Sequence, residues 1–199
     1  MADRPIIFSA PMVRALLEGR KTQTRRLCAW ANNPQSPPLT YIVACDEPGW
    51  FDGDGVQFRV PYAHGNRLWV KEAHARDGNP GNVLVWYREG HAEARARGPR
   101  VDVRWRPSIH MPRWASRLTL TVTEVRVQRL QAISEADALA EGMTFPHGMQ
   151  WGSDPRDAFS GLWGILHTKS GMRWKDDPWV VAISFDVAHC NIDGVQAHG

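Results

Sequence analysis

Residues 116–130 read SRLTLTVTEVRVQRL, and the pattern in this stretch decides the fold class. Apolar residues alternate with polar ones at Leu118, Leu120, Val122, Val125 and Val127. A repeat of two residues is typical of a β-strand with one buried face. The alternation slips by one position at Glu124, which predicts a bulge or bend within one long strand, as occurs in barrel strands.

Two short helices are predicted after this strand. Ser134 and Asp137 resemble a capping box at the start of a helix over residues 135–141. Asp154 can cap the second helix. Pro155 suits its first position, because proline lacks the N–H group that would have no partner there.

The remaining pattern adds a helix near the N-terminus and several further strands. Ser9 can cap this helix, and Gly19 is a natural stop for it. Strands are expected at residues 41–44, 66–72, 83–87 and 179–187, with a hairpin over residues 51–60. Several strands, short helices and one long bent strand imply a compact α+β barrel. The sequence has no glycine-rich phosphate loop between a strand and a helix, which disfavours a doubly wound parallel sheet.

The length of 199 residues fits one domain. We expect a single domain over residues 1–188, with a loop-rich insertion at about 29–60 where prolines and glycines cluster. Residues 189–199 have little to pack and are expected to form a flexible tail. No run approaches the ~20 apolar residues that cross a bilayer. The N-terminus also lacks the order of a secretory signal, so we expect a cytoplasmic protein with no membrane partner.

Composition restricts the classes of site. The three cysteines are widely spaced and form no C-x-x-C pair, so a zinc ribbon is disfavoured. No histidine or carboxylate cluster has metal-ligand spacing, and we expect neither a metal nor another cofactor. The chain carries twenty arginines and four lysines at a net charge of +3. This bias fits either arginine codons of a GC-rich genome or phosphate binding by guanidinium groups. The ten tryptophans fit either a core or platforms that stack bases.

Four stretches together resemble a known family. Residues 18–26 (EGRKTQTRR) resemble the GRKT-x-T-x-R signature of the ASCH domain, a branch of the PUA-like superfamily. Residues 65–72 (GNRLWVKE) are similar to that family's G-D-x-L-x-V strand entry, and residues 133–143 (ISEADALAEGM) to its T-x-E-x-A-x-x-E-G helix. Residues 179–185 fit its last barrel strand. The stretches occur in the family's order, and the larger prophage-encoded members look most similar.

The resemblance implies a fold and a class of ligand. The fold is a small, partly open PUA-like β-barrel with peripheral short helices, in which the GRKT segment lines one wall of a cleft. Members are thought to bind RNA or modified nucleosides. One small bacterial branch consists of amidohydrolases that remove an acetyl group from the exocyclic amine of cytidine, and another member is associated with ribonuclease activity. Compared with the small hydrolases, this chain carries insertions at about 29–60 and 74–113, which could extend the cleft for a polynucleotide.

The resemblance also implies a catalytic set. The amidohydrolase branch uses a lysine, a threonine three residues later and a glutamate of the EG helix, which correspond to Lys21, Thr24 and Glu141. Thr24 would attack the acyl carbon, Lys21 would take its proton and Glu141 would protonate the leaving amine. A lysine can act as base only if its pKa falls by a few units from about 10.4. Side chains alternate along an extended segment, so Lys21 and Thr24 converge only if a turn or bulge separates them. Equally, Lys21 could bind phosphate and Glu141 could form a buried ion pair with it.

Further residues are candidates for substrate binding. The residues beside Lys21 would hold phosphate or stabilise the oxyanion; they are Arg20, Thr22, Arg25 and Arg26. The others would contact a base or phosphate; they are Trp69, Glu72, His110 and Arg113. Glu72 could accept a hydrogen bond from a base edge. Trp69 could stack a base, although core packing is the commoner role. His110 could contact phosphate, act as general acid in RNA cleavage, or form part of a polar turn.

Three other functions remain open at this stage. The first is a binding module for RNA or a modified base without turnover. The second is a ribonuclease that uses Lys21 and His110. The third is a phage structural or assembly factor. The best reading is a protein whose partner is RNA, a nucleoside or a modified base, with hydrolysis of an acylated cytidine amide as its reaction.

Overall fold

The structure is a computed structural model that describes residues 3–29, 32, 42–44, 50–52, 57–76, 84–90, 104–143 and 154–194. The chain divides into two compact units. Unit 1 comprises Met1–Gly19, Gly65–Thr121 and Asp186–Gly199, and unit 2 comprises Arg20–His64 and Val122–Phe185.

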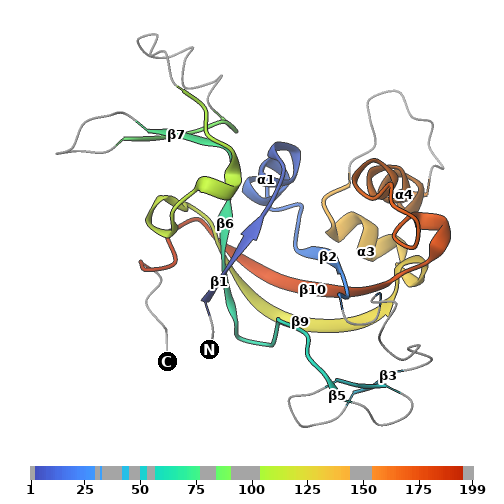
Figure 1. The fold of residues 1–199 in the computed structure, drawn as a ribbon. Coiled ribbons are helices and arrows are strands. Elements are labelled where there is room, and N and C mark those ends of the chain that lie inside the picture. Colours follow the sequence, from blue (N-terminus) through green and yellow to red (C-terminus); the bar gives the residue numbers. More distant parts are fainter. Residues whose placement is uncertain are drawn as a thin grey trace. The chain divides into compact units, whose positions relative to one another are not determined.

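Strands and short helices alternate irregularly along the chain (Figure 1). The strands are β1 (Asp3–Ile7), β2 (Gln23–Leu27), β3 (Ile42–Ala44), β4 (Trp50–Asp52), β5 (Gln57–Phe58), β6 (Arg67–Lys71), β7 (His74–Arg76), β8 (Val85–Tyr87), β9 (Thr119–Arg129) and β10 (Trp179–Ala188). The α-helices are α1 (Ala10–Leu17), α3 (Glu135–Ala140) and α4 (Pro155–Leu166). Short 3₁₀ turns are η1 (Ser108–His110), η2 (Arg113–Ala115), η3 (Leu130–Ala132) and η4 (Trp174–Asp176).

The predicted α+β class is confirmed, and the main sheet is open in the part of the chain that the structure describes. Its strand order is β1-β6-β9-β10-β2. β1 pairs in parallel with β6, β6 pairs antiparallel with the start of β9, and β10 pairs antiparallel with β2. No pairing between β1 and β2 closes this sheet into the barrel that the sequence predicted, as far as the described residues show.

In unit 1 the helix α1 follows β1 directly and is short because its end is set locally. Pro11 occupies the first turn, where the missing N–H costs nothing. Gly19 has a φ of +70°, a left-handed conformation that ends helices and favours glycine. The apolar face carries Val13 and Leu16, both completely buried. The expected cap residue Ser9 precedes the helix but makes no side-chain capping bond.

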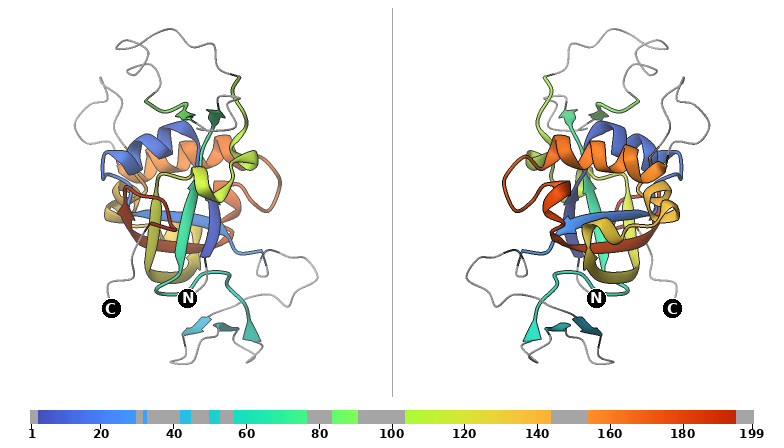
Figure 2. Two further views of the ribbon diagram at one scale, coloured as in Figure 1. Left: turned by 90° about the vertical axis from the view of Figure 1, so that its left-hand side faces the viewer. Right: turned by 90° about the vertical axis from the view of Figure 1, so that its right-hand side faces the viewer.

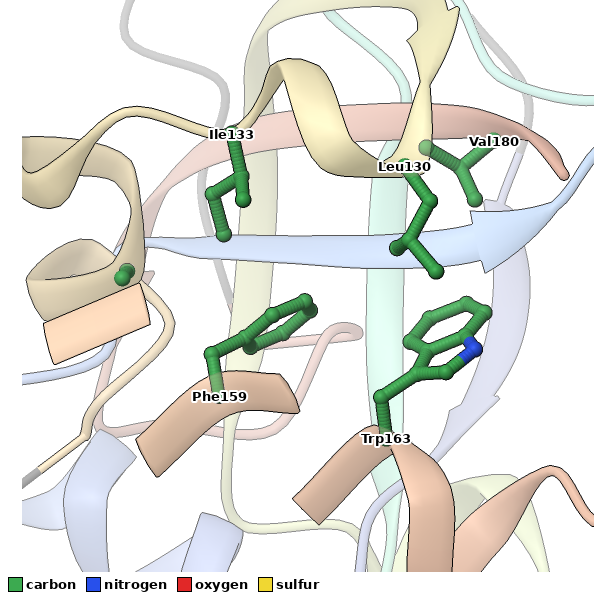
Figure 3. Close-up of a cluster of buried hydrophobic side chains, with 6 residues drawn as sticks. Leu130, Ile133, Phe159, Trp163 and Val180 are labelled. Atoms are coloured by element: carbon green, nitrogen blue, oxygen red, sulfur yellow. The ribbon is translucent and has the colours of Figure 1, made fainter. Parts of the chain in front are cut away.

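In unit 2 the helices α3 and α4 lie side by side (Figure 2) and cover one face of β2 and β10. Ser134 and Asp137 form the predicted capping box of α3, and Asp154 caps α4. The core beneath α4 joins residues distant in sequence (Figure 3), namely Leu130, Ile133, Ala138, Phe159, Trp163 and Val180. This apolar cluster fixes α3 against β2 and thereby positions the polar residues described below.

The structure differs from the sequence prediction at the C-terminal segment. A flexible tail was expected from residue 189, but residues 190–193 pack onto unit 1. Ile192 is completely buried, and the Asn191 amide donates hydrogen bonds to three backbone carbonyls, those of Arg113, Trp114 and Ser116. Ile192, the Asn191 amide and the ion pair of Asp193 with Arg113 hold the segment. The residues from 195 onward lie outside the described part of the chain.

The strands β9 and β7 show where the apolar alternation predicts a strand and where it does not. β9 is one long strand, as expected, and Leu120 and Val122 are completely buried. After Glu124 the residues are half-buried on both faces, so the second phase of the apolar alternation does not mark one buried face. The strand β7 was not predicted, because its three residues HAR lack the apolar alternation on which strand prediction depends.

Candidate functional site

The residues predicted from sequence divide between the two units. Unit 2 holds Lys21, Thr24 and Glu141, together with Arg20, Thr22, Arg25 and Arg26. Unit 1 holds Trp69, Glu72, His110 and Arg113. The two sets are therefore described as two sites.

Lys21 and Glu141 meet in a buried ion pair. The Lys21 Nζ atom lies 2.7 Å from Glu141 Oε2 and 2.9 Å from the Glu141 backbone oxygen. Their side chains are 1% and 5% exposed. The backbone brings them together, because Lys21 forms a β-bridge with Glu141 and the Thr22 N–H donates to the Ala140 carbonyl at 2.8 Å. Of the three predicted catalytic residues, the structure joins these two directly.

A polar network surrounds this pair; it contains the predicted Arg25 and three residues that sequence reasoning did not assign to the site, Gln23, Asp137 and Arg126. Arg25, whose side chain is fully buried, donates to Glu141 Oε1 at 3.2 Å and to Asp137 Oδ2 at 2.9 Å. Its guanidinium also donates to Gln23 Oε1 at 2.6 Å. Arg126 donates to Asp137 Oδ1 at 2.9 Å. Arg25 thus links two carboxylates that lie one helical turn apart on α3.

Two sequence signals could have located this network. Gln23 and Arg25 are separated by two residues, so both project from the same face of β2. Asp137 in the first turn of α3 and Glu141, which directly follows the helix, are four positions apart, so both lie on one face of it. The pairing of these two faces depends on the packing of α3 against β2, which no local pattern contains.

The electrostatics of the pair follow from its burial. Burial lowers the pKa of the Lys21 ammonium, and this effect outweighs the opposing influence of Glu141. The positive charges of Arg26 and Arg25 lower the Lys21 pKa further. A lysine with a lowered pKa releases its proton more readily, which is the property that a general base requires.

Asp137 is the most strongly shifted carboxyl of this network. Burial alone would raise its pKa. Hydrogen bonds from Arg126 and Gln23, with the positive charge of Arg25, outweigh burial and lower that pKa to about 2. Asp137 is therefore ionised at neutral pH and anchors both arginines to the start of α3.

The other predicted residues of unit 2 occupy less central positions. Thr24 is buried and pairs in register with Ile183, and alternation places it on the face of β2 opposite Gln23 and Arg25. The Arg20 guanidinium donates to the Gly142 carbonyl at 2.9 Å, beside Glu141. Thr22 is exposed, and Arg26 is half-buried with its pKa lowered by burial.

In unit 1, Glu72 does not present a free carboxylate. Its side chain is 4% exposed, and Arg117 donates to both carboxylate oxygens at 2.8 and 2.9 Å. The Arg117 guanidinium also lies 4.1 Å from the centre of the Tyr87 ring. Burial raises the pKa of Glu72, against the influence of Arg117. Glu72 was predicted to bind a base edge, whereas in this structure it holds Arg117.

The remaining predicted residues of unit 1 lie near its surface. The Trp69 ring is half-buried, with the Lys71 ammonium 5.4 Å from its centre. Arg113 pairs with Asp3 and Asp193, which ties the chain ends of unit 1 together. His110 ends the turn η1 and is exposed.

The described residues contain neither a metal-binding cluster nor a membrane-spanning helix. No group of three or more histidine, cysteine, aspartate or glutamate residues within them could hold a metal ion. No helix among them is long and apolar enough to cross a lipid bilayer.

Comparison with known proteins gives similarities of fold alone. No protein-family model and no curated protein matches the chain. Among solved structures, the ASCH domain from Lactobacillus crispatus JV V101 matches at a TM-score of 0.44 and 12% identity, over 94% of this chain and 79% of that one. A DUF984 protein from Enterococcus faecalis V583 matches at a TM-score of 0.44 and 12% identity, over 100% of this chain and 86% of that one.

Proposed function

We propose that this protein binds a nucleic-acid base or nucleoside at the Lys21–Glu141 site and hydrolyses an amide on the exocyclic amine of an acylated cytidine. The observation that carries the proposal is the buried contact of 2.7 Å between the Lys21 ammonium and the Glu141 carboxylate. Such a pair holds one base and one acid in a water-poor environment. The resemblance of residues 18–26 and 133–143 to the ASCH motifs supplies the substrate class.

The roles of the residues follow from their chemistry. In the resting pair Lys21 carries the proton and Glu141 is ionised. Catalysis begins from the form in which the proton has moved to Glu141 and the Lys21 amine is neutral, a form that the lowered pKa of Lys21 favours. Thr24 Oγ attacks the acyl carbon while the amine takes the hydroxyl proton. Glu141 then protonates the leaving cytidine amine, and water hydrolyses the acyl-threonine ester.

The neighbouring arginines have different tasks in this scheme. Arg25 is engaged by Asp137 and Glu141, so it holds the carboxylate of Glu141 in place. The half-buried Arg26, whose charge acts on Lys21, is the better candidate to stabilise the oxyanion of the tetrahedral intermediate. Arg20 fixes the Gly142 carbonyl and so supports the end of α3.

A second function is favoured by a specific observation. Lys21 and both carboxylate oxygens of Glu141 already have hydrogen-bond partners within the protein. Thr24 and Arg25 project from opposite faces of β2. Residues held in this way can also line a rigid binding site that binds a ligand without breaking a bond in it. The second candidate is therefore a module that binds RNA or a modified base without turnover.

One assay separates the two functions. The protein is incubated with acetylcytidine, and cytidine and acetate are measured by chromatography. The hydrolase predicts product formation that Lys21→Met, Glu141→Gln and Thr24→Val each reduce by at least about a hundredfold, the usual scale for a lost acid, base or nucleophile. Circular dichroism and thermal unfolding of each variant confirm that it is folded.

The outcomes are distinct. If no product forms but acetylcytidine or RNA binds the wild-type protein, the binding module is correct. If Thr24→Val retains full activity while Lys21→Met loses it, Thr24 is not the nucleophile. Cleavage of RNA without added metal, lost in His110→Ala, would instead support the ribonuclease that the sequence left open.

A further inference from the structure

The strand β7 in unit 1 carries two buried polar groups that the protein satisfies poorly: the His74 imidazole, whose one backbone interaction among the described residues is with Glu72, and the Arg76 Nε atom. His74 is completely buried, and neither ring nitrogen makes a hydrogen bond of normal geometry with the described residues. The Nε atom of Arg76 is likewise buried without a partner there. Buried polar groups in folded proteins are nearly always hydrogen-bonded, so each exception needs a cause.

Both groups belong to one face of a small β-ladder. His74 pairs with Tyr87 of β8 on one side and bridges to Arg106 on the other. Residues directly opposite each other in antiparallel strands project from the same face, as do residues two apart along a strand. His74, Arg76, Tyr87 and Arg106 therefore share a face of this ladder, whose strand β7 is labelled in Figure 1.

This face is cationic, and Glu72, the carboxylate that precedes β7, is already occupied, as is Glu89 after β8, which pairs with Arg14. The charges of Arg76, Arg106 and His110 all act on His74. Glu72 precedes β7, but both of its carboxylate oxygens are bound by Arg117. No described acidic residue forms an ion pair with Arg76 or Arg106, and Arg106 and His110 are exposed.

Arg25 and Arg126 also have a buried Nε atom without a partner, but carboxylates bind the rest of their guanidinium groups. The guanidinium groups of Arg25 and Arg126 donate their remaining N–H groups to carboxylates of unit 2. The Arg76 Nε atom has no hydrogen-bond partner, and the contact printed for the Arg76 guanidinium among the described residues is with the Trp114 ring. An anionic acceptor would satisfy Arg76 and compensate the charge of its neighbours.

An exposed aromatic ring borders the same group of cations. Trp114 is 50% exposed, and the Arg76 guanidinium lies 5.8 Å from the centre of its ring. An exposed tryptophan beside arginines is the combination with which single-stranded nucleic acids are bound, because bases stack on the ring while guanidinium groups hold phosphate.

We propose that the His74–Arg76 face of β7, with Arg106 and Trp114, binds a phosphate group of a single-stranded nucleic acid. Arg76 and Arg106 hold the phosphate oxygens, and an adjacent base stacks on Trp114. The negative charge of the bound phosphate stabilises the protonated form of the buried His74 imidazole. The proposal goes beyond the function proposed above, because none of these residues belongs to the Lys21–Glu141 site.

The first test measures the salt dependence of binding. A short fluorescein-labelled RNA strand is titrated with protein at several salt concentrations, and the fluorescence anisotropy gives the affinity. Affinity falls as salt rises, and each lost phosphate contact makes the negative slope of log affinity against log salt shallower by about 0.7 for a single strand. The double variant R76Q/R106Q should therefore make this slope shallower by about 1.4. The control Arg4→Gln removes an exposed positive charge from β1 of the same unit and should leave the slope unchanged.

The second test uses the buried imidazole as a reporter. The pKa of His74 is followed by NMR, with His74→Gln to assign its signal, in the presence of inorganic phosphate, cytidine monophosphate or the RNA strand. Phosphate binding should raise the pKa of His74, which burial lowers in the free protein. A rise with inorganic phosphate alone identifies a site for small anions. A rise only with RNA identifies the phosphodiester backbone as the ligand.

Two results would overturn the proposal: an unchanged His74 pKa with all three ligands, or a salt slope that is no shallower in R76Q/R106Q than in Arg4→Gln. Hydrolysis of acetylcytidine should be unchanged in R76Q/R106Q. Failure here is therefore distinguishable from failure of the Lys21–Glu141 proposal, which the Lys21→Met variant tests.

Discussion

Replacement of Lys21 by methionine tests whether the buried ion pair organises unit 2. Methionine preserves most of the apolar stem but removes the ammonium that contacts the Glu141 carboxylate and carbonyl. Breaking a buried pair from one side typically costs 3–5 kcal/mol, because the remaining charge is left uncompensated. Arg25 still contacts Glu141 at 3.2 Å, so the lower end, about 3 kcal/mol, is expected.

The magnitude can be measured by urea unfolding. The ten tryptophans of the chain provide a fluorescence signal for the transition. For a protein of this size, a loss of ~3 kcal/mol corresponds to a fall of about 6–12 °C in the midpoint of thermal unfolding. Lys169→Met is the matched control, because Lys169 is exposed and its replacement should change stability by less than about 0.5 kcal/mol.

A double-mutant cycle sharpens the test. Glu141→Gln in the Lys21→Met background removes the uncompensated carboxylate, so the double variant should be more stable than the sum of the two single losses predicts. We expect a coupling energy of about 1–3 kcal/mol, as for residues in direct contact. Additive losses, or a Lys21→Met protein as stable as the wild type, would refute the view that the pair organises this unit.

Four further outcomes are expected. The pKa of Asp137 is about 2 against an ordinary 3.8, so its ionised form stabilises the fold fully above pH ~4 and this effect is lost as the pH falls toward ~2. Urea unfolding over this pH range should show the free energy of unfolding falling by about 2 kcal/mol, and Asp137→Asn should abolish this pH dependence. Ser134→Ala removes the capping box of α3 and should cost about 1 kcal/mol in thermal unfolding, and equal stability would contradict the cap. Arg117→Lys loses the paired hydrogen bonds to Glu72 and the contact with Tyr87, so urea unfolding should show a loss of about 1–3 kcal/mol. Phe159→Ala should cost about 3–5 kcal/mol by the same method, and Phe159→Leu clearly less.

Local signals in the sequence determined where most elements begin and end. The alternation in residues 116–130 specified β9, the cap residues Ser134 and Asp154 specified the starts of α3 and α4, and Gly19 marked the end of α1. These features depend on backbone geometry and on hydrogen bonds between residues a few positions apart. Such interactions are the same in any fold, so they can be recognised without one.

Only the tertiary structure decided which polar residues meet. Lys21 and Glu141 were candidates from their motifs, but their contact, and the Arg25–Asp137 link beside it, exist because α3 packs against β2 across more than a hundred residues of chain. The same holds for the pairing of Glu72 with Arg117 and for the burial of Ile192 and of the His74 ring. The energy of a buried charge or a buried polar atom depends on its neighbours in space, and a sequence lists neighbours along the chain only.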